Sequence, residues 1–201
     1  MSVFIAGTDT DIGKTLVSSW LCLHSGFSYF KPIQSGSINE TDSEIVARLS
    51  GSKIHPEVYR LKEPLSPHQA AKLERVEIDP LSIKLPDHER MIVEGAGGLM
   101  VPINQKYYVI DLIKHFELPV ILIAKSGLGT INHTLLSIEA LRRRNIPLLG
   151  VILTGPLNAS NRASIEDYGE IQVLAEIPQL IKIDKESLKA IPIPPQLLKI
   201  L

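Results

Sequence analysis

The chain has 201 residues, 44% of them hydrophobic, and its 21 basic and 22 acidic residues leave a formal net charge of -1. This length favours one domain over residues 1–201, with a core large enough to need no disulfide or structural metal. Proteins that hold nucleic acid neutralise its phosphates with a basic surface, so the balanced charge excludes nucleic acid as a partner. The single cysteine, Cys22, has no disulfide partner, which is typical of a reducing compartment.

The sequence also argues against a membrane location. Its first residues, MSVFIAGTDTD, contain no basic stretch, and their apolar run is too short for a secretory signal. The longest apolar run elsewhere, residues 120–124, falls far below the roughly 18 residues that cross a bilayer. We therefore expect a cytoplasmic protein with no membrane partner.

Short apolar runs alternate with segments of helical spacing along the chain. We predict strands at 3–6, 29–31, 91–94, 120–124, 149–153 and 172–176, and helices at 14–24, 43–49, 67–73, 110–116, 134–143 and 163–168. This alternation is typical of βαβ units, and continuously apolar strands indicate a mostly parallel sheet covered on both faces. The fold class is therefore α/β, doubly wound. The apolar, proline-interrupted end, residues 191–201, is expected to start extended and to pack against the body.

The strongest motif is GTDTDIGKT, residues 7–15, which joins the first predicted strand to the first predicted helix. The backbone N–H groups of such a loop suit phosphate oxygens, while Lys14 would reach the β- and γ-phosphates and the Thr15 hydroxyl would bind Mg²⁺. The motif therefore predicts a P-loop NTPase type of fold.

This phosphate loop is a variant. Five residues separate Gly7 from Gly13 where the usual pattern has four, and Thr8 stands at an expected glycine position. The alternative is an ordinary glycine turn in which Thr10 or Asp11 caps the helix.

Two acidic residues could complete a metal site. Glu94 ends a predicted strand and precedes the glycine-rich run GAGG, while Asp42 follows a polar loop at a predicted helix start. Ligands gather at the carboxyl ends of strands in a doubly wound sheet, and Mg²⁺ prefers carboxylate and phosphate oxygens. The alternatives are an N-cap for Asp42 and a water-facing charge for Glu94.

A second lysine, Lys31, closes the second predicted strand in the run KPIQSG. From there it could reach the same crevice and stabilise negative charge that develops between two substrates. An ordinary solvated lysine is the alternative.

Several motifs in order resemble the dethiobiotin synthetase family of ATP-dependent enzymes of biotin synthesis. The resemblance covers most of the chain and rests on GTDTDIGKT, KPIQSG, TDSE, EPLSPHQAA, VEGAGGLMVP and LPVILIAKSGLGTINHTLLSIEAL. It implies Mg²⁺- and ATP-dependent conversion of diaminopelargonic acid and CO₂ (or bicarbonate) to a cyclic urea, through a carbamate and a carbamic-phosphoric mixed anhydride.

The resemblance also implies roles for residues. Thr10, Lys14 and Lys31 would face the reacting groups, and Thr15, Asp42 and Glu94 would bind the metal. Ser35 would bind the diamine, and Thr130 and Asn132 would meet its carboxylate from a neighbouring subunit, which makes the protein a homodimer with a shared active site. The nucleotide would be bound by Asp11, Ile12, Gly13, Lys14, Thr15, Leu16, Asp42, Glu94, Gly95, Ala96, Gly97, Thr154 and Pro178.

Three further positions bear on base selection, on the phosphate loop and on a helix start. Thr154 stands where the family has an asparagine that reads the adenine edge, and a hydroxyl cannot make the same two-point contact, so other nucleoside triphosphates are expected to be accepted. Asp11 stands where better-known members have glutamate. His133 is expected to be a packing residue at a helix start.

A partitioning or division-site ATPase is the competing interpretation, because such proteins share this variant loop and fold. They require a second lysine early in the loop, where this chain has Gly7, Thr8 and Asp9. A GTPase is disfavoured because no Asn-Lys-x-Asp motif is present.

Overall fold

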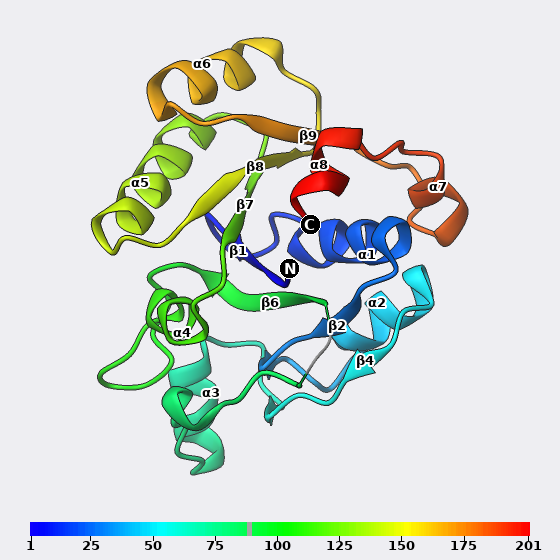
Figure 1. The fold of residues 1–201 in the computed structure, drawn as a ribbon. Helices are drawn as coiled ribbons and strands as arrows, with labels where there is room; N and C mark the ends of the chain where they lie inside the picture. Colours follow the sequence, from blue (N-terminus) through cyan, green and yellow to red (C-terminus); the bar gives the residue numbers. More distant parts are fainter. Residues whose placement is uncertain (88–89) are drawn as a thin grey trace.

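The computed structural model describes residues 1–87 and 90–201, and its centre is a seven-stranded sheet (Figure 1). The strand order is β4-β2-β6-β1-β7-β8-β9, and each neighbouring pair is parallel. The strands are β1 (Val3–Gly7), β2 (Ser28–Phe30), β4 (Ile54–His55), β6 (Met91–Gly98), β7 (Val120–Lys125), β8 (Leu148–Thr154) and β9 (Val173–Ile177). The predicted doubly wound parallel sheet is confirmed.

Helices cover both faces of this sheet (Figure 1). One face carries α1 (Lys14–Ser25), α2 (Asp42–Ser50), α7 (Lys185–Lys189) and α8 (Pro195–Ile200), whose apolar residues share one core cluster. The other face carries α3 (Pro67–Glu74), α4 (Val109–Phe116), α5 (Thr130–Arg143) and α6 (Ala159–Gly169), with the short 3₁₀ helix η1 (Pro80–Ser82). No helix within the described residues is long and apolar enough to cross a membrane.

Successive side chains along each strand point to opposite faces of the sheet, so each strand contributes to the hydrophobic core on both faces. In β1, Val3 and Ile5 pack on the side of α1, whereas Phe4 and Ala6 pack on the opposite side. All four side chains are buried because the sheet is covered twice, which explains why the strands are continuously apolar in sequence.

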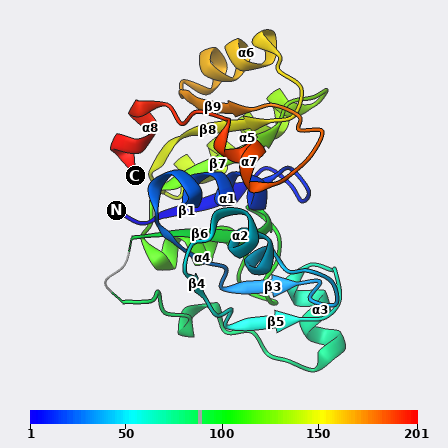
Figure 2. The ribbon, with the colours of Figure 1, turned by 90° about the vertical axis from the view of Figure 1, so that its right-hand side faces the viewer.

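A second, two-stranded sheet pairs β3 (Ile33–Ser35) with β5 (Tyr59–Leu61) in parallel and lies beside α2 and α3 (Figure 2). The backbone N–H of Gly36 continues this pairing by donating to the Glu63 carbonyl over 2.9 Å. These strands, like β4, were not predicted because runs of two or three residues carry no clear periodicity. The small sheet fixes the segment that leads from β2 to α2.

Two helices begin earlier than predicted. α5 starts at Thr130 instead of residue 134, after Gly129 with a positive φ of 92°. α6 starts at Ala159 instead of residue 163, because the Asn158 side chain caps it by accepting from the Asn161 backbone N–H over 3.0 Å. Glycine and asparagine before a helix are start signals that the prediction left unused.

The end of the chain packs against the body as predicted, but it is not extended throughout. Residues from Pro195 form α8, and α7 precedes it without having been predicted. The Trp20 indole N–H donates to the Ile191 carbonyl over 2.9 Å, and the Met1 ammonium donates to the Leu201 carbonyl over 2.8 Å. The two ends of the chain therefore lie together beside α1.

Candidate active site

A cavity of about 610 Å³ opens at the carboxyl ends of β1 and β6. Its other walls come from the loop before α1, from residues 31–36 around β3, from the start of α2 and from residues 64–67. Of the residues singled out in the sequence, the cavity is lined by Thr10, Asp11, Gly13, Lys14, Thr15, Lys31, Ser35, Asp42, Glu94, Ala96 and Gly97. The topology therefore brings the phosphate loop, both lysines and both carboxylates to one place, as predicted.

The phosphate loop leads into α1 at Gly13 and is closed by a contact between Lys14 and Asp9. Gly13 is the N-cap of α1 with a φ of 93°, so the alternative in which Thr10 or Asp11 caps the helix is wrong. The Lys14 ammonium donates to the Asp9 carbonyl over 2.8 Å, within the loop. Burial lowers the pKa of Lys14, which indicates an ammonium group that lacks full solvation.

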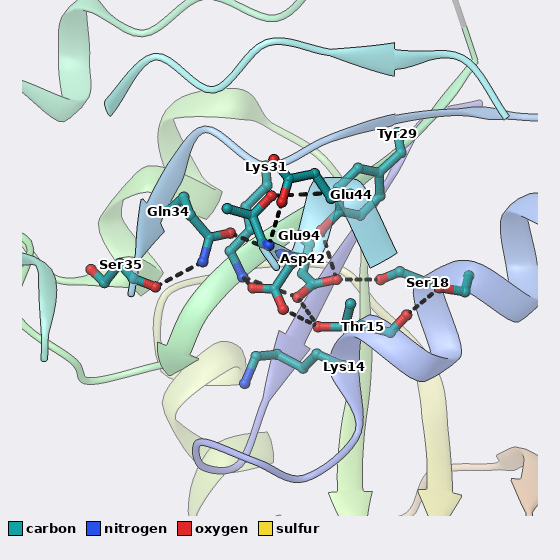
Figure 3. A network of polar contacts seen from close by, with 12 residues as sticks. Lys14, Thr15, Ser18, Tyr29, Lys31, Gln34, Ser35, Asp42, Glu44 and Glu94 are labelled. Carbon is teal, nitrogen blue, oxygen red and sulfur yellow. Dashed lines mark hydrogen bonds and ion pairs between the residues drawn. The ribbon is translucent and has the colours of Figure 1, made fainter. Parts of the chain in front are cut away.

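Three side chains that carry oxygen donor atoms meet beside this loop (Figure 3). The Thr15 hydroxyl lies 2.7 Å from Asp42 Oδ1 and 3.0 Å from Glu94 Oε1. The described residues contain no group of three His, Cys, Asp or Glu that could hold a metal ion. Two carboxylates and a hydroxyl beside a phosphate loop nevertheless fit Mg²⁺, which takes its remaining ligands from phosphates and water.

Lys31 bridges the two carboxylates. Its ammonium forms a short ion pair with Asp42 Oδ2 and lies 3.1 Å from Glu94 Oε1. Burial alone would lower the pKa of Lys31, but the charges of Glu94 and Asp42 raise it above its ordinary value. The same contact, opposed by burial, holds the pKa of Asp42 below its ordinary value. Lys31 is therefore a buried cation and not a solvated lysine.

The Asp42 carboxylate lies in the site and does not cap α2, because another residue caps that helix. Thr41 is the N-cap of α2 and forms a reciprocal capping box with Glu44. The backbone N–H of Asp42 donates to Gln34 Oε1 over 3.3 Å, which ties the helix start to β3. The alternative that made Asp42 a plain N-cap is wrong.

Glu94 is buried, with 1% of its surface exposed, so it is not the water-facing charge of the alternative. Besides Thr15 and Lys31, it contacts two residues that the sequence analysis missed, Ser18 and Tyr29. Burial, followed by the charge of Glu94, raises the pKa of the Tyr29 phenol well above its ordinary value. Spacing is the signal that points to both residues: Tyr29 is two positions before Lys31, which directly follows β2, and Ser18 follows Thr15 by about one turn of α1.

The run after Glu94 needs glycine for space. A Cβ on Gly95 would lie 2.9 Å from the Phe4 ring, and one on Gly97, whose φ is +73°, would lie 2.9 Å from Val101 Cγ2. Three of the residues expected to bind the phosphates, Ile12, Leu16 and Gly95, do not line the cavity. Ile12 is buried in the core beside α1, and Leu16 packs against that core. That these residues bind a nucleotide stays a prediction, in which their backbone groups make the contact.

Two further residues expected to bind the nucleotide, Thr154 and Pro178, lie outside the cavity. The Thr154 hydroxyl, at the end of β8, donates to the Ile12 carbonyl over 2.6 Å. Pro178 directly follows β9 and is half-buried. Both strands end on the same edge of the sheet as the phosphate loop, since β8 and β9 are parallel to β7 and β1.

Thr130 and Asn132 stand at the start of α5, and neither lines the cavity. Asn132 is exposed, whereas the buried Thr130 hydroxyl finds no hydrogen-bond partner within the described parts of the chain. His133 is exposed and lines a neighbouring groove of about 320 Å³ with Leu136 and Val101, so its prediction as a packing residue is wrong.

Comparisons with known proteins show which proteins this chain is similar to. Residues 1–187 match the AAA domain family. The chain is 54% identical over 197 residues to the ATP-dependent dethiobiotin synthetase BioD of Lawsonia intracellularis, covering 98% of this chain and 97% of that protein. It is 50% identical over 194 residues to the protein of the same name from Paramagnetospirillum magneticum, covering 96% and 95%.

Solved structures show the fold. A ParA family ATPase from Chlorobium tepidum aligns with a TM-score of 0.59 at 12% identity, covering 94% of this chain and 90% of that one. The cell division ATPase MinD of Pyrococcus furiosus aligns with a TM-score of 0.59 at 15% identity, covering 96% and 90%. The fold is thus shared with the competing class, whereas high identity over the whole length is found with the synthetases. The chain belongs to the dethiobiotin synthetase family, the ligases of biotin biosynthesis.

Proposed function

We propose that this chain converts 7,8-diaminopelargonic acid and CO₂ to dethiobiotin, with MgATP consumed to ADP and phosphate. The observation that carries this proposal is the buried Lys31 held between Asp42 and Glu94 at the mouth of a phosphate loop. A phosphate loop alone would serve many ATPases. A second buried cation beside the metal ligands suits a reaction in which negative charge passes between two bound substrates.

The reaction has three steps. One amine of the substrate adds to CO₂ and loses a proton to give a carbamate. A carbamate oxygen then attacks the γ-phosphorus and ADP leaves, which forms a carbamic-phosphoric mixed anhydride. The second amine attacks the carbonyl carbon and phosphate leaves, which closes the cyclic urea.

This chain's residues would act by position and charge. Lys14 would leave the Asp9 carbonyl to contact the β- and γ-phosphates, and Lys31 and Thr10 would face the carbamate and the transferring phosphoryl group. Thr15, Asp42 and Glu94 would hold Mg²⁺, which supplies neutralisation of the phosphate charge when bound. Ser35, whose hydroxyl is buried without a partner in the described chain, would bind the diamine.

The substrate carboxylate would be bound by a second copy of the chain. The start of α5 carries Thr130 and Asn132 on a helix N-terminus, which suits an anion but lies outside the cavity of its own subunit. Around it, Leu128, Leu136 and Met100 expose apolar surface. A homodimer would cover this surface and complete the site across the interface.

The nucleotide base would lie near Thr154 and Pro178, and the loop from Asp11 to Leu16 together with Gly95, Ala96 and Gly97 would contact the phosphates. Because the Thr154 hydroxyl is held by Ile12, we propose that other nucleoside triphosphates are accepted beside ATP. We place the reaction in the cytoplasm and treat residues 1–201 as one domain.

The test is phosphate release from MgATP by the purified protein, with and without diaminopelargonic acid and bicarbonate, with the product identified by mass. Release that requires the diamine and yields dethiobiotin supports the proposal. Release that ignores the diamine, or that membranes or DNA stimulate, would favour a switch ATPase. For the dimer, Leu136→Glu is expected to give a monomer in sedimentation experiments; an unchanged mass would contradict the placement of the interface.

A further inference from the structure

Two hydroxyl groups hold the Glu94 carboxylate from positions outside the active-site cavity (Figure 3). Ser18 Oγ donates to Glu94 Oε2 over 2.7 Å, and the Tyr29 hydroxyl donates to the same oxygen over 3.0 Å. Both side chains are fully buried. Each hydroxyl therefore reaches the site only through Glu94.

The two carboxylate oxygens of Glu94 thus have different surroundings. Oε2 accepts from Ser18 and Tyr29, which uses both of its lone-pair directions. Oε1 lies 3.0 Å from the Thr15 hydroxyl and 3.1 Å from the Lys31 ammonium, and both of these residues line the cavity. Only Oε1 is left to face a ligand in the cavity.

The fold provides these contacts through the same elements that provide the site. Tyr29 lies on β2, and Lys31, two positions later, directly follows the end of that strand, where its ammonium contacts Glu94. The parallel register pairs Tyr29 with Ile92, which puts Glu94, two residues further along β6, on the same face of the sheet as Tyr29. Ser18 lies one turn beyond Thr15 on α1 and reaches Glu94 from above this face.

We propose that Tyr29 and Ser18 are positioning residues that fix the Glu94 carboxylate so that Oε1 alone is presented to a divalent cation. The inference rests on the proposed function, in which Glu94 is a metal ligand. Without the two donors, the carboxylate could turn about its terminal torsion and direct either oxygen at Lys31. Removing partners of this kind lowers metal affinity by roughly 10- to 100-fold in metalloproteins.

The test uses Tyr29→Phe and Ser18→Ala, which remove the hydroxyls and keep the shape of the side chains. Mn²⁺ binding in the presence of ADP is followed by electron paramagnetic resonance, and a rise in the Mn²⁺ Kd of about tenfold is expected for each variant. In turnover, the Mg²⁺ concentration for half-maximal rate should rise, and saturating Mg²⁺ should restore most of kcat. ADP affinity measured with EDTA present should stay unchanged.

Matched controls remove the same groups elsewhere. The Tyr59 hydroxyl accepts from the Asp79 backbone N–H over 3.1 Å, and the Ser50 hydroxyl donates to the Val46 carbonyl over 2.7 Å. Tyr59→Phe and Ser50→Ala should leave the Mn²⁺ Kd at the parent value. An equal weakening in these controls would overturn the inference, because it would reflect general loss of stability.

A parent-like Mn²⁺ Kd in both Tyr29→Phe and Ser18→Ala would also overturn it. Thermal unfolding of each variant shows whether it is folded, and Ser18→Ala tests the same oxygen if Tyr29→Phe proves unstable. If the parent protein binds no Mn²⁺ with ADP, the metal role proposed for Glu94 fails, and the positioning roles fail with it. That result differs from one in which the parent and both variants bind Mn²⁺ equally well.

Discussion

The Thr154 hydroxyl donates a hydrogen bond of 2.6 Å to the backbone carbonyl of Ile12, inside the phosphate loop. Thr154 is buried, and its methyl group would lie 3.1 Å from a Cβ added to Gly13. The side chain therefore supports the loop and has no free donor to offer a base. Selection among bases must come from other groups or be weak.

We accordingly predict that the enzyme uses several nucleoside triphosphates. The values of kcat/KM for ATP, GTP and CTP at equal Mg²⁺ should differ by less than about tenfold. A single net hydrogen bond contributes at most about 1.5 kcal/mol, and about 1.4 kcal/mol corresponds to a factor of ten. Steady-state phosphate release with each nucleotide measures these values. Rejection of all nucleotides except ATP would show that another group reads the base.

Lys31→Met is predicted to lower kcat by about 100- to 1000-fold, the usual loss when one preorganised charge-stabilising group is removed. ADP binding should change much less, since Lys14 and the loop backbone remain. Steady-state kinetics and ADP titration separate the two effects. The control is Lys114→Met on α4, which removes an exposed lysine away from the cavity. Parent-like kcat in Lys31→Met would contradict the role given to this ammonium.

Stability at acid pH should depend on Asp42. Although burial opposes it, Lys31 holds the pKa of Asp42 below its ordinary value. Since the folded-state pKa lies below the unfolded one, the unfolded chain takes up the proton more readily, and this stabilisation is present at neutral pH. It should be lost as the pH falls below about 4, the ordinary pKa of aspartate, and through the folded-state pKa.

Urea unfolding between about pH 2 and pH 7, without divalent cations, measures this loss. The free energy of unfolding should fall less steeply below about pH 4 in Asp42→Asn than in the parent. Asp167→Asn, which changes an exposed carboxylate on α6, should follow the parent curve. Parallel curves for Asp42→Asn and the parent would show that the ion pair does not stabilise the fold.

Gly97→Ala should destabilise the protein more than Gly26→Ala. Both glycines have a positive φ, +73° and +71°, but a Cβ on Gly97 would lie 2.9 Å from Val101 Cγ2, whereas one on Gly26 meets nothing within 4 Å. The backbone cost alone is about 1–2 kcal/mol, and overpacking adds about 1–3 kcal/mol. Chemical denaturation of both variants separates the two contributions; equal losses would mean that Val101 moves aside freely.

The sequence was informative where a local pattern carries the structure. The continuous apolar runs located the six strands that form the body of the large sheet, and strand, loop and helix around Lys14 located the phosphate site. The short strands β3 and β5 were missed because pairing between distant segments, and not their own residues, defines them. α8 was missed because the prolines at 192, 194 and 195 indicated a segment that starts extended, and no helix was predicted after them.

The site was harder to predict than the fold. Lys31 and Glu94 are far apart in sequence, and the parallel register of β2 and β6 makes them neighbours. Asp42 joins them from the start of α2. The family resemblance supplied what spacing could not. Tyr29 and Ser18 escaped because a buried tyrosine and a helix serine are ordinary core residues until the Glu94 carboxylate is placed between them.

The contact between the Lys14 ammonium and the Asp9 carbonyl has a consequence for affinity. A free lysine side chain loses up to about 2 kcal/mol of rotamer entropy when it is immobilised. Here that ordering takes place during folding, so an arriving phosphate exchanges one oxygen partner of the ammonium for another. Because the Lys14 side chain is already ordered, little of the free energy of nucleotide binding is lost to ordering it.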